Sequence, residues 1–336
     1  MFREAGEAPA RVRAQLASNA PAMAALGARL RAQPPRAVVT FGRGSSDHAA
    51  TYLRYLVETR LGVMTASAAP SVSSVYDAAP GMEGMLCVAI SQSGRSPDLL
   101  AATEAAAGAG ATVVALVNDE ASPLAAQADL VLPLHAGPEL SVAATKSYIC
   151  ALTAAAQLVG HWLQDAALLK ALDRLPGLLD EAWRQPWPQA EAKLATARGL
   201  YVLGRGPGFG IAQEAALKFK ETCGLHAEAF SAAEVRHGPM ALVGPGFPVL
   251  AFVQADETQD GVEAAVAACV AQDAEVLQVG GRDQAGACRL PAPRAHPALE
   301  PIAFVQGFYR MACGLAVARG FDPDRPPNLS KITETT

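Results

Sequence analysis

Short runs of apolar residues alternate in this chain with longer segments of helical character. In the first half, the apolar runs predict strands at residues 37–41, 86–90, 112–117 and 130–134. The segments around them predict helices at residues 9–32, at 47 to about 59, from Pro97 onward, and at 142 to about 163. Because alternating polar residues do not interrupt the apolar runs, these runs favour a parallel sheet that is covered on both faces.

The second half of the chain repeats this order of elements. The run 200–203 leads into the turn Gly204-Arg205-Gly206, as the run 37–41 leads into Gly42-Arg43-Gly44. Matching elements are predicted at 247–253, 276–279, 289–290 and, for the closing helix, 301–319. The offset stays near ~160 residues, which indicates a duplicated domain rather than a solenoid of short repeats. We therefore predict an α/β protein with two tandem doubly wound parallel-sheet domains, at residues 1–180 (with an N-terminal helix) and 181–320, followed by a tail at 321–336.

Composition and charge exclude several classes of protein. The chain has 336 residues and a formal net charge of −5, which argues against non-specific nucleic-acid binding. Although 51% of the residues are apolar, no run approaches the ~20 apolar residues of a membrane span. The charged and polar N-terminal segment does not resemble a signal peptide. The six cysteines are scattered without a CxxC pair, so we expect reduced core residues in a cytoplasmic protein.

The motifs give no support to a metal site or a nucleotide cofactor. The six histidines make no HExxH or other paired ligand spacing. The Gly-Arg-Gly turns lack the GxGxxG spacing, and no acidic residue ends the following strand, as a dinucleotide ribose would require. A GxxxxGK[ST] loop is also missing from the sequence. We therefore expect no cofactor and no metal.

Titratable residues gather within residues 214–240, EAALKFKETCGLHAEAFSAAEVRHGPM. Lys218 and Glu221 are three residues apart and lie on one face of a predicted helix that Gly224 ends. An amine, a carboxylate and the imidazole of His237 suit proton transfer on a small polar substrate. A solvated helix face with ion pairs explains any one of these charges equally well, and His237-Gly238-Pro239 alone is compatible with an ordinary turn.

Hydroxyl groups gather in three loops that precede predicted helices. The loops are Gly44-Ser45-Ser46, Ser91-Gln92-Ser93-Gly94-Arg95-Ser96 and Ser141 to Thr145. In open parallel sheets, ligands bind beyond the carboxyl ends of the strands, and the start of a helix favours an anion. For Ser45 and Ser141, a helix N-cap remains an equal alternative to ligand contact. The loop 91–96 offers three hydroxyls and an amide, which is more than capping requires.

These residues carry a resemblance to a known family. The segments SQSGRSPD, GPELSVAATKS, LGRGPGFGIAQEAALKFKETCGLHAEAFSAAEVRHGPMAL and RPPNLSKIT are similar to the isomerase half of glucosamine-6-phosphate synthase, which is a pair of sugar isomerase (SIS) domains. The resemblance runs over almost the whole chain. It implies two flavodoxin-like domains and a site for a hexose 6-phosphate at the first sheet, completed by the second half and by the tail, which would lie over the active site.

The resemblance also implies a role for individual residues. Glu221 matches the acid/base between C1 and C2, Lys218 a lysine near these atoms, and Lys331 the tail lysine that bonds an open-chain ketose. His237 matches a ring-opening histidine that the neighbouring subunit contributes, which implies a homodimer with shared active sites. The implied substrate-binding residues are Ser45, Ser46, Ser91, Gln92, Ser93, Ser96, Val142 and Ala144. Two departures stand out, since GRGSS replaces a Cys-Gly-Thr-Ser turn and Ala144 replaces a serine.

The direction of the reaction is a further expectation. The synthase carries a glutaminase domain with an N-terminal cysteine, whereas this chain begins Met1-Phe2 and shows no such domain. We therefore expect a SIS-type glucosamine-6-phosphate deaminase that needs no metal. Alternatives are a galactosamine-6-phosphate deaminase, another phosphosugar deglycase, an aldose–ketose isomerase, or a non-catalytic sugar-phosphate sensor. The expected partners are a hexosamine or hexose 6-phosphate and a second copy of the chain, without nucleic acid or membrane.

Overall fold

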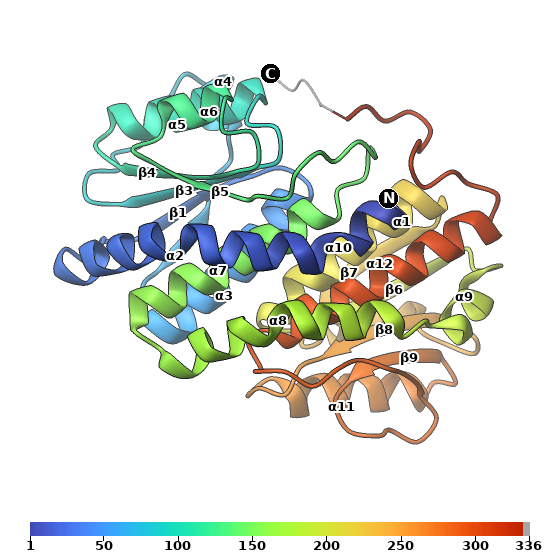
Figure 1. Cartoon of the computed structure of the whole chain (residues 1–336). Coiled ribbons are helices and arrows are strands. Elements are labelled where there is room, and N and C mark those ends of the chain that lie inside the picture. The colour runs from blue at the N-terminus through green and yellow to red at the C-terminus, as the bar shows by residue number, and fades with distance from the viewer. Residues whose placement is uncertain (332–336) are drawn as a thin grey trace. The chain divides into compact units, whose positions relative to one another are not determined.

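The computed structural model describes residues 1–331, so residues 332–336 of the predicted tail, including the end of the RPPNLSKIT segment, lie outside the described residues. The chain divides into two compact units, each built on one five-stranded sheet (Figure 1). The sheet-A unit comprises Ala10–Glu139, Lys146–Asp173 and, from Ser330, the end of the described chain. The sheet-B unit comprises Met1–Pro9, Leu140–Thr145 and Arg174–Leu329.

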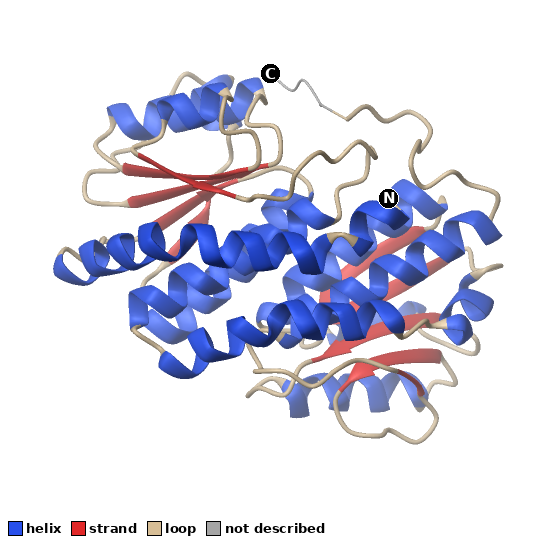
Figure 2. Ribbon diagram, in the orientation of Figure 1, coloured by secondary structure: helices blue, strands red, loops and turns tan. Residues whose placement is uncertain are grey.

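Sheet A is a parallel sheet with the strand order β2-β1-β3-β4-β5. Its strands are β1 (Val38–Phe41), β2 (Thr65–Ser67), β3 (Leu86–Ser91), β4 (Thr112–Val117) and β5 (Leu130–Pro133). The helices of this half are α2 (Ala8–Ala32), α3 (Ser45–Leu61), α4 (Ser71–Ser74), α5 (Pro97–Gly108), α6 (Pro123–Gln127) and α7 (Lys146–Leu163). Figure 2 shows helices on both faces of this sheet, as its uninterrupted apolar strands require.

Sheet B is also parallel, with the order β10-β9-β8-β6-β7. Its strands are β6 (Gly199–Gly204), β7 (His226–Ser231), β8 (Pro248–Val253), β9 (Glu275–Gly280) and β10 (Cys288–Leu290). The other elements are α1 (Phe2–Gly6), α8 (Ala166–Arg184), α9 (Pro188–Leu194), α10 (Pro207–Cys223), the short 3-10 helices η1 (Glu234–Arg236) and η2 (Pro239–Leu242), α11 (Gln259–Val270) and α12 (Glu300–Ala318).

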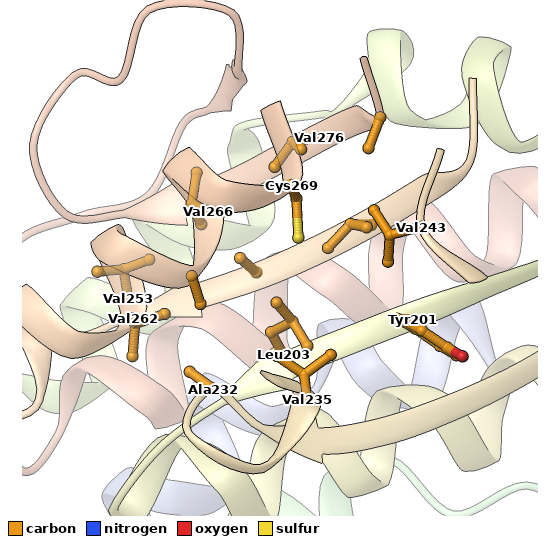
Figure 3. Close-up of a cluster of buried hydrophobic side chains, with 14 residues drawn as sticks. Tyr201, Leu203, Ala232, Val235, Val243, Val253, Val262, Val266, Cys269 and Val276 are labelled. Carbon is orange, nitrogen blue, oxygen red and sulfur yellow. The ribbon is translucent and has the colours of Figure 1, made fainter. Parts of the chain in front are cut away.

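The core of each unit lies between its sheet and the covering helices. In sheet B, one buried cluster joins side chains of β6, β8 and β9 to Val262, Val266 and Cys269 of α11 (Figure 3). The β-branched side chains of the strands pack well on a pleated surface of this kind. All six cysteines are free, five of them buried and Cys288 half-buried. Helix α12 has the length and composition of a membrane span, but 78% of it is buried inside the protein, as in the core helix of a folded domain.

The two sheets confirm the predicted fold class and the duplication. Read from β2 and from β7, the orders β2-β1-β3-β4-β5 and β7-β6-β8-β9-β10 are identical, so each strand of sheet A has a counterpart in sheet B. This is the flavodoxin-like doubly wound order. The matching of 37–41 with 200–203, and of 86–90 with 247–253, therefore pairs the true counterparts β1 with β6 and β3 with β8.

Several predicted elements are corrected by the structure. The helix predicted from Val142 begins only at Lys146, since residues 141–145 form a loop. The edge strands β2 and β7 were not predicted, and Glu234–Arg236 forms a single 3-10 turn. The segment that joins the two predicted domains is mostly helical, because α8 continues through Pro176 to Arg184 and α9 follows. The edge strand β2 has only three residues, and both β2 and β7 carry polar residues, so these two strands lack the apolar run that marks the central strands.

Candidate active site

The switch point of sheet A lies between β1 and β3, where the strand order reverses direction. The loop Gly42–Ser46 follows β1, and the loop Gln92–Ser96 follows β3. Ligands of open α/β sheets bind in the crevice at this place, outside the carboxyl ends of the strands. Helices α3 and α5 begin at these two loops, and their N-termini favour a bound anion.

The hydroxyl groups of these loops are not used as helix caps. Gly44 is the N-cap of α3, with a φ of 53°, so Ser45 and Ser46 lie in the first turn of the helix. Ser96 is the N-cap position of α5 but makes no side-chain capping bond. The N-cap interpretation of Ser45 is therefore wrong, since the positive φ that this turn requires favours glycine as the cap.

The serines after β3 instead shape their own loop. The backbone N–H of Gly94 donates to Ser91 Oγ at 2.9 Å, and the N–H of Arg95 donates to Ser93 Oγ at 3.3 Å. Ser91 is buried, whereas Gln92, Ser93 and Ser96 are half-buried and accessible to a ligand. A Cβ atom at Gly94 would lie 2.2 Å from Ser122 Oγ, so this glycine allows the close approach of the loop to the turn before α6.

A polar cavity adjoins the loop after β1. Its volume is about 320 Å³, and its lining includes Arg43, Asp47 and Ser67. Ser67 Oγ donates to Asp47 Oδ1 at 3.0 Å. Arg43 also forms an ion pair with the buried carboxylate of Asp98. The cavity thus presents a cation and a hydroxyl beside the N-terminus of α3, and Arg43 connects it to Asp98 in the first turn of α5.

The loop with Val142 and Ala144 belongs to the sheet-B unit. Its backbone is held by the buried carboxylate of Glu4, which accepts from the N–H groups of Leu140 at 2.5 Å and Ser141 at 3.2 Å. Burial raises the pKa of Glu4, but these two bonds and a bond with the Ser141 hydroxyl together lower it by more. The net pKa of Glu4 therefore lies below the ordinary value. The structure places Val142 and Ala144 half-buried on this anchored loop.

Ser141 takes part in the same anchoring. Its hydroxyl donates to Asp324 Oδ1 at 2.7 Å, and Val142 N donates to the carbonyl of Asp324 at 3.3 Å. Because α7 begins five residues later, at Lys146, Ser141 does not cap it, and the N-cap interpretation of Ser141 is wrong. The role of Ser141 in the structure is to join the loop to the segment that follows α12.

Helix α10 carries a buried network of charged side chains. Lys218 Nζ donates to Glu221 Oε2 at 2.5 Å and lies 3.3 Å from Glu214 Oε1. The side chains of Lys218 and Glu214 are 1% and 0% exposed, whereas that of Glu221 is 20% exposed. Glu221 is therefore the side chain of the network that a substrate could contact.

The electrostatics of the network keep Lys218 charged. Burial lowers the pKa of Lys218, but the carboxylates of Glu214 and Glu221 raise it by more, so its net pKa lies above the ordinary lysine value. This charged ammonium pairs with the partly exposed carboxylate of Glu221 at 2.5 Å.

Two members of this arrangement were not identified from the sequence. Glu214 lies four residues before Lys218, a spacing that places both on one helix face and could have been recognised. Tyr309, which donates its hydroxyl to Glu214 Oε1 at 2.8 Å, comes from α12 and is 95 residues away in the sequence. Such a contact leaves no local pattern.

The remaining candidate residues lie on turns and at the end of the described chain. His237 is exposed between η1 and η2, and its backbone N–H donates to the carbonyl of Glu234 at 2.9 Å. Lys331 lies in the sheet-A unit, where its Nζ is 3.4 Å from Glu139 Oε2. The side chain of Glu139 is fully buried and also accepts from the backbone N–H and hydroxyl of Ser147 at 3.1 and 2.6 Å.

At the switch point of sheet B, a buried side chain of the protein lies between the two loops. Gln254 is fully buried after β8, and its Nε2 donates to the carbonyl of Arg205 at 2.6 Å and to Thr258 Oγ1 at 2.9 Å. A Cβ atom at Gly208 would lie 2.3 Å from Gln254 Oε1. Gln254 thus lies between the loop after β6 and the loop after β8.

Comparisons with known proteins agree with this fold. Residues 33–160 and 193–288 match the SIS domain model. The glutamine–fructose-6-phosphate aminotransferase (isomerizing) of Aeropyrum pernix is 35% identical over 311 residues, covering 86% of this chain and 50% of that protein. The chain therefore spans half the length of this curated relative.

Solved structures give the same result. A candidate phosphosugar isomerase from Silicibacter pomeroyi DSS-3 has 44% identity and a TM-score of 0.92, covering 96% of this chain and 99% of that chain. The C-terminal domain of the glucosamine-fructose-6-phosphate aminotransferase from Francisella tularensis has 23% identity and a TM-score of 0.86, covering 97% of this chain and 98% of that chain. At 23% identity, the second likeness shows the fold alone.

Proposed function

This chain belongs to the SIS domain family, and from this premise we propose that it is a glucosamine-6-phosphate deaminase. The reaction converts glucosamine 6-phosphate and water into fructose 6-phosphate and ammonia. The observation that carries the proposal is the network on α10, in which a buried ammonium lies between two carboxylates and one of these, Glu221, is partly exposed. A sugar-phosphate sensor has no need of a base held in this way.

The phosphate of the substrate would bind at the switch point of sheet A. The hydroxyls of Ser46, Ser93 and Ser96 and the amide of Gln92 can donate to its oxygens, and the N-termini of α3 and α5 favour its charge. Ser45 and Ser91 belong to the same loops, and Val142 and Ala144 would contact the sugar. Binding the non-reacting end of the substrate supplies orientation for the reacting carbon atoms.

The reaction begins with opening of the sugar ring, which requires an acid/base near neutral pH. The imidazole of His237 suits this step because histidine changes its charge in that range. His237 is exposed on its turn. In the proposed mechanism it serves a neighbouring copy of the chain, which makes the working enzyme a homodimer.

Proton transfer between C2 and C1 then follows at Glu221. The ionised carboxylate takes the proton from C2, which gives an enolamine, and returns it at C1, which gives an imine at C2. Water adds to this imine, and ammonia leaves as fructose 6-phosphate forms. Lys218 pairs with Glu221 before the transfer and lies within hydrogen-bond distance of it.

Ammonia and fructose 6-phosphate measured in parallel, from glucosamine 6-phosphate without glutamine, test the proposal. Equal formation of both products is expected, and Glu221→Gln should abolish both together. Comparison with galactosamine 6-phosphate identifies the preferred C4 epimer. If glucosamine 6-phosphate binds but yields neither product, the deaminase proposal is wrong, and fructosamine phosphates would then test for a deglycase.

A second candidate function is an aldose–ketose isomerase that acts on a sugar phosphate without an amine. The 44% identity to the phosphosugar isomerase candidate from Silicibacter pomeroyi favours it. The same groups would move a proton between C1 and C2 of the aldose through an enediol. Interconversion of hexose 6-phosphates, without ammonia release from any amino sugar, would identify this activity.

A further inference from the structure

We propose that Tyr309 is a positioning residue, whose hydroxyl holds Glu214 and thereby sets the proton count of the network that ends at Glu221. The inference rests on the proton transfer proposed above. In this scheme Tyr309, which lies on α12, does not contact the substrate. It acts on Glu221 through Glu214 and Lys218, the two buried residues of α10.

The contacts form an unbroken chain from the interior to the accessible carboxylate. The Tyr309 hydroxyl donates to Glu214 Oε1 at 2.8 Å, and Lys218 Nζ lies 3.3 Å from that same oxygen. Lys218 then donates to Glu221 Oε2 at 2.5 Å. Tyr309 and Glu214 are fully buried, so their bond is shielded from water. A hydrogen bond to an ionised group is stronger in such a setting than at the surface.

The charge of the network explains why a hydroxyl donor is needed. Two carboxylates, Glu214 and Glu221, share the single ammonium of Lys218, and the carboxylate of Glu214 is fully buried, so it needs a further hydrogen-bond donor inside the protein. Without the Tyr309 hydroxyl, the carboxylate of Glu214 would draw Lys218 towards itself, because the ammonium would have to replace the lost donor. This change would weaken the hold of Lys218 on Glu221.

The other charged and titratable groups on the elements packed against α10 have different partners. On α12, Arg310 bonds the carbonyl of Trp183 and Glu300 pairs with Arg294, while Cys313 is a buried thiol. On β7, His226 and Glu228 are exposed. On β6, the ring of Tyr201 packs against two phenylalanines. Among these groups, Tyr309 is the one with a described hydrogen bond to the network.

A purely structural role for Tyr309 is the alternative, because its ring also packs against Phe308 at 5.9 Å between centroids. Tyr309→Phe separates the two roles, since it keeps the ring and removes only the hydroxyl. Tyr201→Phe is the matched control, because Tyr201 is also buried in the sheet-B unit. It removes a hydroxyl that does not belong to the network.

The test compares the pH profiles of kcat and kcat/KM for the two variants and the wild type. Removing a hydrogen bond to a charged group changes an equilibrium by about 10–100-fold. We therefore expect Tyr309→Phe to lower kcat by about ten-fold or more at neutral pH and to move the acid limb to higher pH, with KM changed less than about two-fold. Tyr201→Phe should retain the wild-type profile. A Tyr309→Phe enzyme with an unchanged kcat and acid limb would overturn the inference.

A second readout separates failure of this inference from failure of the proposed function. Uptake of solvent deuterium at C1 of fructose 6-phosphate reports proton transfer without any release of ammonia. If the wild type shows neither exchange nor turnover, the proposed function has failed. In that case, carbon-13 NMR of labelled glutamate carboxyl groups tests the inference by following the titration of Glu214. The Glu214→Gln variant assigns the signal. Tyr309→Phe should move the titration of Glu214 to higher pH, and an unmoved titration would refute the role of Tyr309.

Discussion

Arg43 and Asp98 join the two loops at the switch point of sheet A. The guanidinium Nε and Nη2 of Arg43 lie 2.8 and 2.6 Å from Asp98 Oδ2. The side chain of Asp98 is fully buried, whereas that of Arg43 is 51% exposed. The pair therefore fixes the spacing between the loop after β1 and the start of α5, where the proposed phosphate site lies.

Replacing Arg43 tests this link. Arg43→Gln leaves the buried carboxylate of Asp98 without its ion-pair partner, so we expect a loss of about 1–3 kcal/mol in the free energy of unfolding. The KM for the sugar phosphate should also rise. Urea unfolding and steady-state kinetics measure the two effects. Arg95→Gln is the matched control, because its partner Asp119 is 38% exposed and such surface pairs contribute about 0–1 kcal/mol. Equal losses in both variants would contradict a special role for the Arg43 pair.

Glu221→Gln tests the base. The amide keeps the size of the side chain but cannot accept the C2 proton, so we expect kcat to fall by about 10²–10⁴ with substrate binding nearly unchanged. Isothermal titration calorimetry and steady-state rates measure the two quantities. Glu228→Gln makes the same exchange at an exposed position on β7 and should keep full activity. Retained turnover in Glu221→Gln would remove the assignment.

The pKa of Glu4 predicts a dependence of stability on acid pH. Although burial raises this pKa, the bonds from Leu140 and Ser141 bring it below the ordinary value of 4.5. A carboxyl group with a depressed pKa stabilises the folded state fully above its unfolded pKa, and this contribution is lost as pH falls through the folded value. Glu4→Gln should therefore flatten the decline in stability below pH 4.5, relative to the wild type. Denaturant midpoints at a series of pH values measure this, and parallel curves for both proteins would argue against it.

Lys331 gives a chemical prediction. If its amine attacks the C2 carbonyl of the open-chain ketose, an imine forms with loss of water, and added cyanoborohydride reduces it to a stable amine. We expect mass spectrometry to find a fructose 6-phosphate adduct on Lys331 after this treatment. Lys170, an exposed lysine on α8, is the internal control and should remain unmodified. Modification of both lysines, or of neither, would count against a specific role for Lys331.

The sequence was sufficient to predict the central strands but not the contacts between distant segments. Strands β3, β4 and β8 follow from apolar runs because they are buried on both faces. In β7, by contrast, His226 and Glu228 alternate with apolar residues at the edge of the sheet, which hides the strand among helix-forming residues. The end of α10 at Gly224 was predictable, since that residue adopts a φ of +56° that favours glycine.

The candidate site shows the same limit. Lys218 and Glu221 could be paired from their spacing because a helix brings residues three apart together. The bonds of Glu139 to Ser147 and Lys331 join positions 8 and 192 residues apart, and the longer separation cannot be read from a local pattern. The roles assigned to His237 and Lys331 remain predictions, and the reduction experiment above addresses that of Lys331.

Gln254 makes the two duplicated halves of this protein unequal. Two copies of one binding fold would each have inherited a crevice, yet in sheet B the carboxamide of Gln254 lies between the two loops and bonds the loop of its own chain. In the proposed mechanism, that half instead contributes the helix that carries Glu221. A chain of this kind should saturate with one equivalent of sugar phosphate, so any sigmoidal response to substrate would have to arise between chains rather than between the two halves of one.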